Sequence, residues 1–172
     1  KGSVYEGGLR VPLLVRWPAR IRPGRVCDRV TGFEDWFPTL LELAGGAALV
    51  PKDIDGVSFA PTLLGRRQKA RLFLYREYPG GGGQQCVLMG DWKAVRTELD
   101  PRFGPLGTER PVELYHLRRD PAEVRNVAQD HPRVASRLDR MLRLQHAVAP
   151  VFPFPRLDRV AIESIAEPDP SP

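Results

Sequence analysis

The sequence predicts an α/β part followed by a small α+β unit, and three observations support this expectation. The first 66 residues hold an apolar run typical of a strand and two apolar segments with helix-start and helix-stop residues. From residue 70 onward, short aromatic and apolar runs alternate with glycine turns, and an amphipathic segment follows them. We therefore predict that residues 1–66 form the edge of a larger α/β sandwich. Residues 70–147 should form an antiparallel sheet of about four strands covered by one helix.

The first part opens with a glycine-rich turn. Residues 1–12 contain three glycines and a closing proline, and Gly7 and Gly8 permit either a positive φ or the close approach of another surface. Residues 11–17 are apolar apart from one arginine, which is typical of a buried strand. Lys1 therefore precedes a turn that leads into a predicted strand, and functional residues are often held on loops of this kind.

Two helices are expected next. Asp35 stands at a helix-capping position before the segment 36–44, and two glycines end that segment. Its apolar residues recur at helical spacing, and such a stripe is more often core than ligand pocket. The stripe consists of Phe37, Leu40, Leu41 and Ala44. Ser58 is expected to cap a shorter helix that ends at Gly65.

The second part has the pattern of strands. They are expected at 72–78, 85–89, 92–97 and 112–117. Gly90-Asp91 predicts a hairpin turn between the second and third of them. Asp130 is expected to cap the closing helix, with Pro132 in its first turn. Residues 148–172 are predicted to be a proline-rich extended tail.

Composition and charge argue against several classes of protein. The longest apolar runs are far shorter than the roughly 18 residues of a membrane helix, so no membrane span is expected. The net charge is +5, but acidic residues are interleaved and aromatic residues lack the spacing for base stacking, so nucleic acid is not an expected partner. The three histidines show no metal-ligand spacing. Cys27 and Cys86 form no metal or redox motif and are either free thiols or one disulfide.

Several motifs follow one another along the chain. They are Lys1-Gly-x-x-Tyr5-Glu6-Gly7-Gly8-x-Arg10-Val11-Pro12, Trp17-Pro18, Asp35-x-x-Pro38-Thr39-Leu40-Leu41, Gly90-Asp91-Trp92-Lys93 and Glu113-Leu114-Tyr115-His116-Leu117-x-x-Asp120-Pro121-x-Glu123-x-x-Asn126. Together they resemble the sulfatase family, in particular the formylglycine-dependent arylsulfatases of the alkaline phosphatase superfamily. The resemblance covers roughly residues 1–145. The family usually has Asp where His116 stands, a departure in a structural turn.

The resemblance implies a fold and a site. Residues 1–66 would be the C-terminal part of an alkaline-phosphatase-like sulfatase catalytic domain, and residues 70–147 a small C-terminal subdomain. Lys1 would correspond to the family's active-site lysine, which binds sulfate oxygens and stabilises the transition state of sulfuric ester hydrolysis. No other residue of this chain corresponds to the family's catalytic or metal-binding set. Neither Cys27 nor Cys86 lies in the family's Cys-x-Pro-Ser/Ala-x-Arg motif.

The resemblance also implies what lies outside this chain. Both the formylglycine nucleophile and calcium, or another divalent cation, would be held by residues upstream. The chain begins without Met and inside a motif, so we expect a C-terminal fragment that is inactive alone. Its expected partners are an N-terminal catalytic half and a sulfate-ester small molecule or carbohydrate.

Two other functions stay open on the sequence. A phosphonate or phosphodiester hydrolase of the same superfamily has a similar architecture and metal site. A non-catalytic binding or assembly module is the alternative from a different class. Localisation is open as well, between a bacterial periplasmic or secreted protein and a cytoplasmic one.

Overall fold

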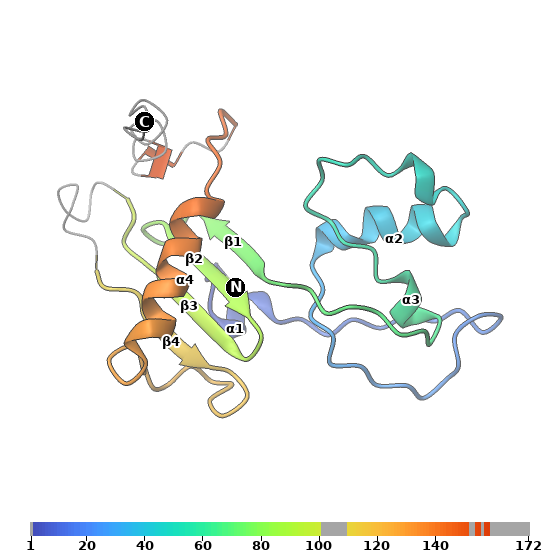
Figure 1. The fold of residues 1–172 in the computed structure, drawn as a ribbon, viewed down its shortest axis with the longest axis horizontal. Helices are drawn as coiled ribbons and strands as arrows, with labels where there is room; N and C mark the ends of the chain where they lie inside the picture. The colour runs from blue at the N-terminus through green and yellow to red at the C-terminus, as the bar shows by residue number, and fades with distance from the viewer. Residues whose placement is uncertain (1, 101–109, 152–153, 156, 159–172) are drawn as a thin grey trace, which may run out of the picture. The chain divides into compact units, whose positions relative to one another are not determined.

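The computed structural model describes residues 2–100, 110–151, 154–155 and 157–158. The chain divides into two compact units. One unit consists of residues 12–72, and the other joins the N-terminal segment up to Val11 with the chain from Phe73 onward (Figure 1).

The second of these units is built on a four-stranded antiparallel sheet of order β1-β2-β3-β4. Its strands are β1 (Leu74–Tyr78), β2 (Gln84–Met89), β3 (Trp92–Arg96) and β4 (Glu113–His116). The hairpin predicted at Gly90-Asp91 joins β2 to β3, and Gly90 has the positive φ of 59° that favours glycine in such a turn. The predicted sheet of about four strands is therefore confirmed.

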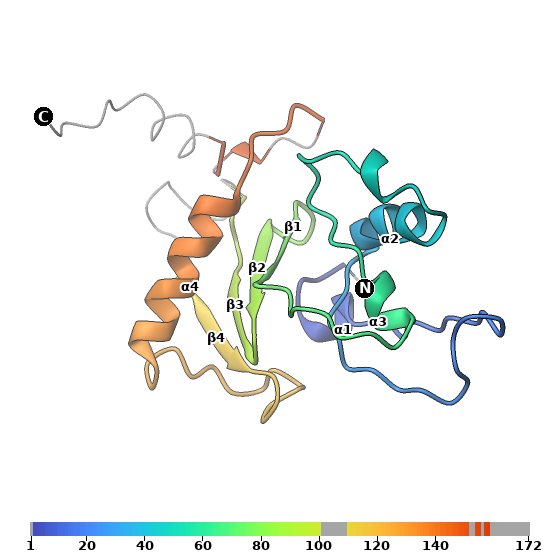
Figure 2. The same ribbon diagram turned by 45° about the vertical axis from the view of Figure 1, so that its right-hand side comes forward.

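Helix α4 (Pro132–Gln145) covers one face of this sheet (Figure 2). Aliphatic side chains of the sheet and of the helix form the core between them. They are Val87, Ala94, Leu114, Ala135, Leu138 and Leu142. Pro132 begins the helix as expected, but the capping prediction for Asp130 is wrong, because His131 occupies the cap position. The Asp130 carboxylate instead accepts a bond from the Arg125 guanidinium at 2.9 Å.

The N-terminal segment with α1 (Glu6–Leu9) packs on the opposite face of the sheet (Figure 2). Alternation along the strands creates this second face: Cys86 pairs with Val95, whereas Val87 pairs with Ala94 toward α4. The sequence grouped this segment with the residues up to 66, whereas its contacts are with the sheet. The boundary between a catalytic-domain part and a subdomain remains a prediction.

The unit of residues 12–72, the helical unit, consists of four short helices joined by long irregular segments. It contains the 3₁₀ helices η1 (Phe33–Asp35) and η2 (Ala47–Leu49) and the α-helices α2 (Trp36–Leu43) and α3 (Ala60–Leu63). The strand predicted at 11–17 is wrong: this run is irregular, and Leu14 is 88% exposed. A strand needs a neighbouring strand to pair with its backbone N–H and C=O groups. Among the described residues of this unit there is no such neighbouring strand.

Helix α2 confirms the predicted helix but not its buried face. Phe37 and Leu40 of the predicted stripe are exposed, and the helix instead buries Pro38 and Thr39. The Thr39 hydroxyl accepts a bond from the Phe59 N–H at 2.9 Å and donates to the Asp35 carbonyl. Polar bonds to the loop before α3 therefore select the buried side of this short helix.

Asp35 stands at the N-cap position of α2, as the sequence predicts, but it does not cap the helix through its side chain. The side chain is 1% exposed and makes no capping bond to α2. Its carboxylate accepts bonds from the N–H groups of Gly32 at 2.8 Å and Val57 at 2.7 Å and pairs with Arg71. Asp35 thus joins three separate stretches of its unit. The cap position of α3 is Phe59 rather than the predicted Ser58, whose hydroxyl accepts a bond from the Ala60 N–H at 3.2 Å.

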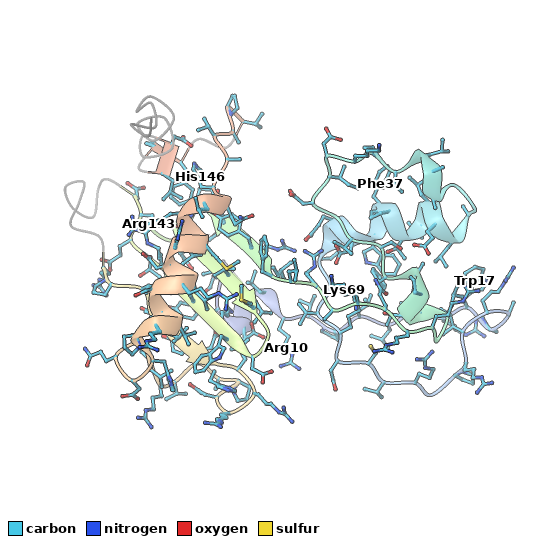
Figure 3. All side chains as sticks on the ribbon, viewed as in Figure 1. Arg10, Trp17, Phe37, Lys69, Arg143 and His146 are labelled. Atoms are coloured by element: carbon cyan, nitrogen blue, oxygen red, sulfur yellow. The ribbon has the colours of Figure 1, made fainter. Side chains whose placement is uncertain are left out.

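Part of the predicted C-terminal tail is packed. Phe154 and Leu157 form a small buried cluster with Leu99. His146, which follows α4 (Figure 3), lies 2.6 Å from Glu77 Oε1 through Nδ1 and 2.9 Å from Asp158 Oδ1 through Nε2. The rest of the predicted tail, from residue 159, is outside the described residues. Of the helices that the structure describes, none has the length and apolar character that crossing a membrane requires.

Candidate functional site

Lys1, the predicted sulfate-binding residue, lies outside the described residues, but the turn that follows it is described. Gly2 has a φ of +73°, and a Cβ at this position would lie 3.4 Å from the Tyr78 hydroxyl oxygen. Glycine suits this conformation because it carries no Cβ. The backbone next to Lys1 therefore runs against the end of β1.

Val4 is the next anchor of this turn. Its side chain is 1% exposed and packs with Cys86, Val95 and Tyr115 on the face opposite α4. Its N–H donates to Gln84 Oε1 at 3.1 Å, in a buried bond to the first residue of β2. One apolar contact and one directional bond thus fix the chain three residues after Lys1.

Gly8 allows α1 to fold back onto the residues before it. A Cβ on Gly8 would lie 2.1 Å from the Ser3 carbonyl oxygen, whereas a Cβ on Gly7 would meet nothing within 4 Å. Neither glycine has a positive φ. The sequence allowed either a positive φ or the close approach of another surface at these glycines. The structure has the close approach, and only at Gly8.

A buried lysine holds the first residue of α1. Lys93 of β3 is 1% exposed, and its Nζ lies 2.9 Å from Glu6 Oε1 and 2.8 Å from Glu123 Oε1. The other oxygen of Glu123 accepts a bond from the Glu6 N–H at 2.5 Å. Glu6 is therefore held through both its side chain and its backbone, and its partner is Lys93 rather than the nearby Arg10.

Glu123 reaches this position from a tight turn after β4. Its φ is +56°, which is uncommon for a residue with a side chain, and its carboxylate is 3% exposed. Asp120 stabilises the turn by accepting bonds from the N–H groups of Val124 at 3.1 Å and Arg125 at 2.9 Å. These bonds, the one from Arg125 first, lower the pKa of the Asp120 carboxyl.

Two tyrosines and a glutamate connect the same turn to β4. The Tyr5 and Tyr115 hydroxyls both donate to Glu113 Oε2, at 2.5 and 2.8 Å. Their rings meet edge to face with centroids 6.0 Å apart. Burial, followed by the bond to Glu113, raises the pKa of each phenol well above its ordinary value. Both tyrosines therefore remain neutral hydrogen-bond donors at physiological pH.

This arrangement can position a residue, but its described side chains offer no activated nucleophile. Burial raises the pKa of the Cys86 thiol to about 11, and a thiol is nucleophilic as its thiolate. Cys27 is exposed, and both cysteines are free thiols. Within the stretches that the structure describes, no three His, Cys, Asp or Glu side chains could hold a metal ion. The residues that the structure describes therefore fit neither a formylglycine nor a divalent-cation site.

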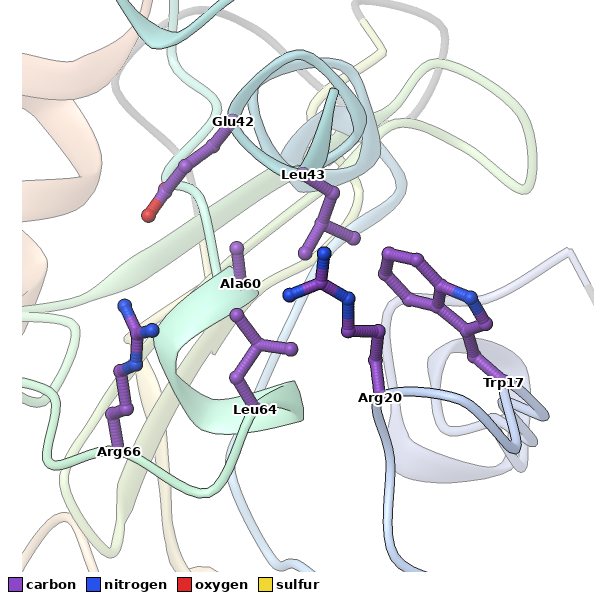
Figure 4. Close-up of a pocket in the computed structure, with 7 residues that line it drawn as sticks. All are labelled: Trp17, Arg20, Glu42, Leu43, Ala60, Leu64 and Arg66. Carbon is purple, nitrogen blue, oxygen red and sulfur yellow. The ribbon is translucent and has the colours of Figure 1, made fainter. Parts of the chain in front are cut away.

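The helical unit carries a pocket of its own (Figure 4). Two arginines, a tryptophan, a glutamate and three aliphatic residues line it. They are Trp17, Arg20, Glu42, Leu43, Ala60, Leu64 and Arg66. The Arg20 guanidinium carbon lies 5.9 Å from the centre of the Trp17 ring, which is within cation–π range. The sequence indicated none of these as a site, because they are spread over about fifty residues.

The sequence also did not single out Lys93 and Glu123 as parts of the site. Both stand inside motifs that resemble the sulfatases, and Lys93 lies within a predicted strand between apolar neighbours. A charged residue facing inward from a strand is seldom buried without a partner. The position of Lys93 between apolar neighbours was therefore the available sign that its side chain is buried and paired. Its partner could not be identified in this way, because Glu6 and Lys93 are more than eighty residues apart in the sequence.

Comparison with known proteins agrees with these motifs. Residues 1–147 match the family model described as N-sulphoglucosamine sulphohydrolase, C-terminal. The chain is 31% identical to an N-acetylgalactosamine-6-O-sulfatase of Bacteroides thetaiotaomicron over 149 residues, 83% of this chain and 28% of the relative. It is 37% identical to arylsulfatase A of Bos taurus over 150 residues, 78% of this chain and 29% of the relative.

Solved structures show the same likeness. A protein of Bacteroides thetaiotaomicron, solved in connection with the metabolism of multiple glycosaminoglycans, is similar to this chain with a TM-score of 0.62 and 30% identity. The similarity covers 83% of this chain and 30% of that one. The chain thus spans less than a third of the length of these relatives. It belongs to the sulfatases, whose C-terminal portion it matches over residues 1–147.

Proposed function

We propose that this chain is the C-terminal portion of a longer enzyme that hydrolyses sulfate esters of a carbohydrate or another small molecule. The observation that carries the proposal is the family match over residues 1–147, which includes the turn after Lys1. The chain's share of its relatives' length, 28% and 29%, supports the presence of a preceding catalytic portion. Sulfated carbohydrate is the favoured substrate class, since one relative is named an N-acetylgalactosamine-6-O-sulfatase.

In this proposal Lys1 binds the sulfate group. An ammonium is a compact donor suited to the concentrated charge of a sulfate oxygen. Placed where negative charge develops, it stabilises the transition state more than the ground state. The backbone after it is anchored at Gly2, Val4 and Glu6, which supports a fixed point of departure for the side chain.

The formylglycine nucleophile and the divalent cation belong to the preceding portion in this proposal. The described residues fit neither group, as Cys86 is buried with a raised pKa and no metal-binding cluster occurs among them. We therefore assign them no step within this chain. The chain alone should not hydrolyse sulfate esters, because one lysine cannot supply the roughly 8 kcal/mol or more that enzymes contribute.

The exposed apolar surface of the helical unit supports the same proposal. Leu14, Leu40 and Val26 are 88%, 56% and 91% exposed, and burying such side chains against a further part of the protein would be favourable. A preceding catalytic portion would cover such a surface.

The test is Lys1→Ala in the full-length enzyme, with Lys52→Ala as the matched control because Lys52 is exposed. Loss of one preorganised donor typically lowers the rate by about 10²–10³-fold. We expect kcat/KM for an aryl sulfate or a sulfated sugar to fall by that factor in Lys1→Ala and to stay unchanged in Lys52→Ala. Mass spectrometry and metal analysis verify that both variants carry formylglycine and metal. Near-normal turnover of Lys1→Ala would overturn the role of this residue.

A further inference from the structure

The buried lysine of β3 is not explained by the stability of the sheet. Lys93 is 1% exposed, and it stands in the same strand as Ala94 and Val95, which are fully buried. Replacing a buried ion pair by apolar residues of similar size is often neutral or even stabilising. A residue whose charge is dispensable for stability but whose bonds are directional is suited to fixing one geometry.

The side chains of Lys93 and Glu123 both bind Glu6, which lies in the turn after Lys1. The Lys93 ammonium holds the Glu6 carboxylate at 2.9 Å and one oxygen of Glu123 at 2.8 Å. The second oxygen of Glu123 holds the Glu6 N–H at 2.5 Å. Glu6 is five residues from Lys1 and begins α1 within the turn of residues 2–9, so these bonds hold the middle of that turn.

The backbone of Glu123 adds an independent sign. Its φ of +56° is strained for a residue with a Cβ, and such strain persists only where the surroundings over-determine it. Asp120 holds this turn by accepting bonds from three backbone N–H groups: its carbonyl accepts from Glu123 at 3.2 Å, and its carboxylate accepts from Val124 and Arg125. The turn thus presents a buried carboxylate to Lys93 and to Glu6 from a costly conformation.

Lys93 does not itself bind the sulfate. Its Nζ is buried between two carboxylates, which compensate its charge and would repel an anion. Any effect on catalysis must therefore pass through the turn that it holds.

We propose that Lys93, with Glu123, is a positioning residue for sulfate-ester hydrolysis, because it fixes the turn Gly2–Leu9 and so the backbone from which Lys1 extends. This inference rests on the proposed function of Lys1. A misplacement of about 1 Å by a residue remote from the chemistry can cost up to 10²-fold in rate. Lys93 should accordingly affect kcat more than the global fold.

The test is a double-mutant cycle in the full-length enzyme. Lys93→Met removes the charge at similar length, and Lys93→Met with Glu123→Gln avoids leaving a buried carboxylate unpaired if the single variant does not fold. We expect kcat/KM to fall by about 10- to 100-fold. In the Lys1→Ala background the same changes should have no further effect, because there is no lysine left to position. If the Lys93 changes lower kcat/KM by the same factor with and without Lys1, the two residues act independently and the proposal is overturned.

A matched control lies on the other face of the same sheet. Leu142→Ala opens a cavity under α4, so it lowers stability, but the folded enzyme should keep its kcat/KM. Amide hydrogen exchange of residues 2–9 gives a readout that does not need activity: it should accelerate at least tenfold in the Lys93 variants and stay unchanged in Leu142→Ala.

The outcomes separate the two proposals. Unchanged exchange in the Lys93 variants overturns this inference even in an active enzyme. A wild-type enzyme that carries formylglycine and metal but turns over no sulfate ester overturns the proposed function, and this inference falls with it. Two results together support both the proposed function and this inference. Amide exchange of residues 2–9 is faster in the Lys93 variants, and the Lys93 changes no longer lower kcat/KM once Lys1 is alanine.

Discussion

Adding one methyl group to Gly8 should open the N-terminal turn, while the same change at Gly7 should not. The Cβ of Gly8→Ala would lie 2.1 Å from the Ser3 carbonyl oxygen. A carbon and an oxygen rarely approach closer than about 3.3 Å, so the backbone must move by roughly 1.2 Å. Overpacking of this kind typically costs about 1–3 kcal/mol and occasionally more.

Gly7 provides the matched control, because its added Cβ would meet nothing within 4 Å. Gly7→Ala should stabilise by about 0.4–1 kcal/mol, since alanine restricts the unfolded chain and the native φ is compatible with a side chain. The two variants should therefore differ by about 1.4–4 kcal/mol in the free energy of opening the turn. The effect should appear in the local opening of residues 2–9 before it appears in the sheet.

The assay is amide hydrogen exchange of residues 2–9, with the amides of α4 as an internal reference. Exchange should accelerate in Gly8→Ala and remain constant or slow in Gly7→Ala. Under the proposed function, turnover of a sulfate ester by the full-length enzyme should fall in Gly8→Ala and stay near the unmodified level in Gly7→Ala. Equal exchange in the two variants would refute the reasoning, because it would mean that the contact between Gly8 and Ser3 does not hold the turn.

Three further outcomes follow from the structure. At pH 8 a thiol reagent should modify Cys27 rapidly and Cys86 only after unfolding, since Cys86 is 2% exposed with a pKa of about 11; two fast thiols in the native protein would contradict this. The free energy of unfolding should fall as the pH rises above about 9, because the folded-state pKa values of Cys86 and Tyr5 lie above their ordinary values of 9.0 and 10.0. The unfolded chain therefore releases these two protons at a lower pH than the folded chain does. Urea denaturation from pH 8 to 11 measures this, and a flat profile would argue against both shifts. Phe154→Ala should lower the free energy of unfolding by about 3–5 kcal/mol if its site cannot collapse, as seen in the urea midpoint, whereas a freely extended tail would show no change.

The sequence was sufficient for the sheet because local signals specify it. Alternating apolar residues and the Gly90-Asp91 turn set the strands β2 and β3 to within a residue, and Pro132 marks the start of α4. The apolar run 11–17 carries the same local signal as a strand, yet it is exposed and irregular. Whether such a run forms a strand depends on a neighbouring edge, which the run itself does not encode.

Asp35 and Asp130 show why the caps were less predictable. Asp35 stands at the cap position of α2, but its carboxylate binds the Val57 N–H and Arg71 instead of the first turn of that helix. Asp130 lies one residue before the cap position, which His131 occupies, and its carboxylate binds the nearby Arg125. A local capping signal therefore does not fix the first residue of a helix, and other donors compete for the carboxylate.

The candidate site was predicted in part for a similar reason. The motif after Lys1 singled out the turn and its two glycines, and the structure assigns the close approach to Gly8 alone. Lys93 and Glu123 belong to the same site through long-range pairing, which spacing along the chain does not reveal. The sheet register places Lys93 beside Tyr115 of β4, and the turn that follows β4 brings Glu123 to Lys93.

The two faces of this sheet are held by different kinds of interaction, so amino-acid substitutions on them should have different effects. The α4 face is packed mainly by aliphatic contacts such as those of Leu114 and Leu138, which are non-directional and tolerate exchange at constant volume, beside a bond from the buried Gln85 to the Leu142 carbonyl at 3.3 Å. The opposite face holds the N-terminal turn through bonds of Lys93, Glu123 and Gln84, which require particular atoms at particular distances. Aliphatic packing stabilises a sheet without selecting the position of a neighbouring backbone to a few tenths of an ångström, whereas charged hydrogen bonds do select it. Substitutions under α4 should therefore change how stable this unit is, and substitutions on the other face should change where its N-terminal turn lies.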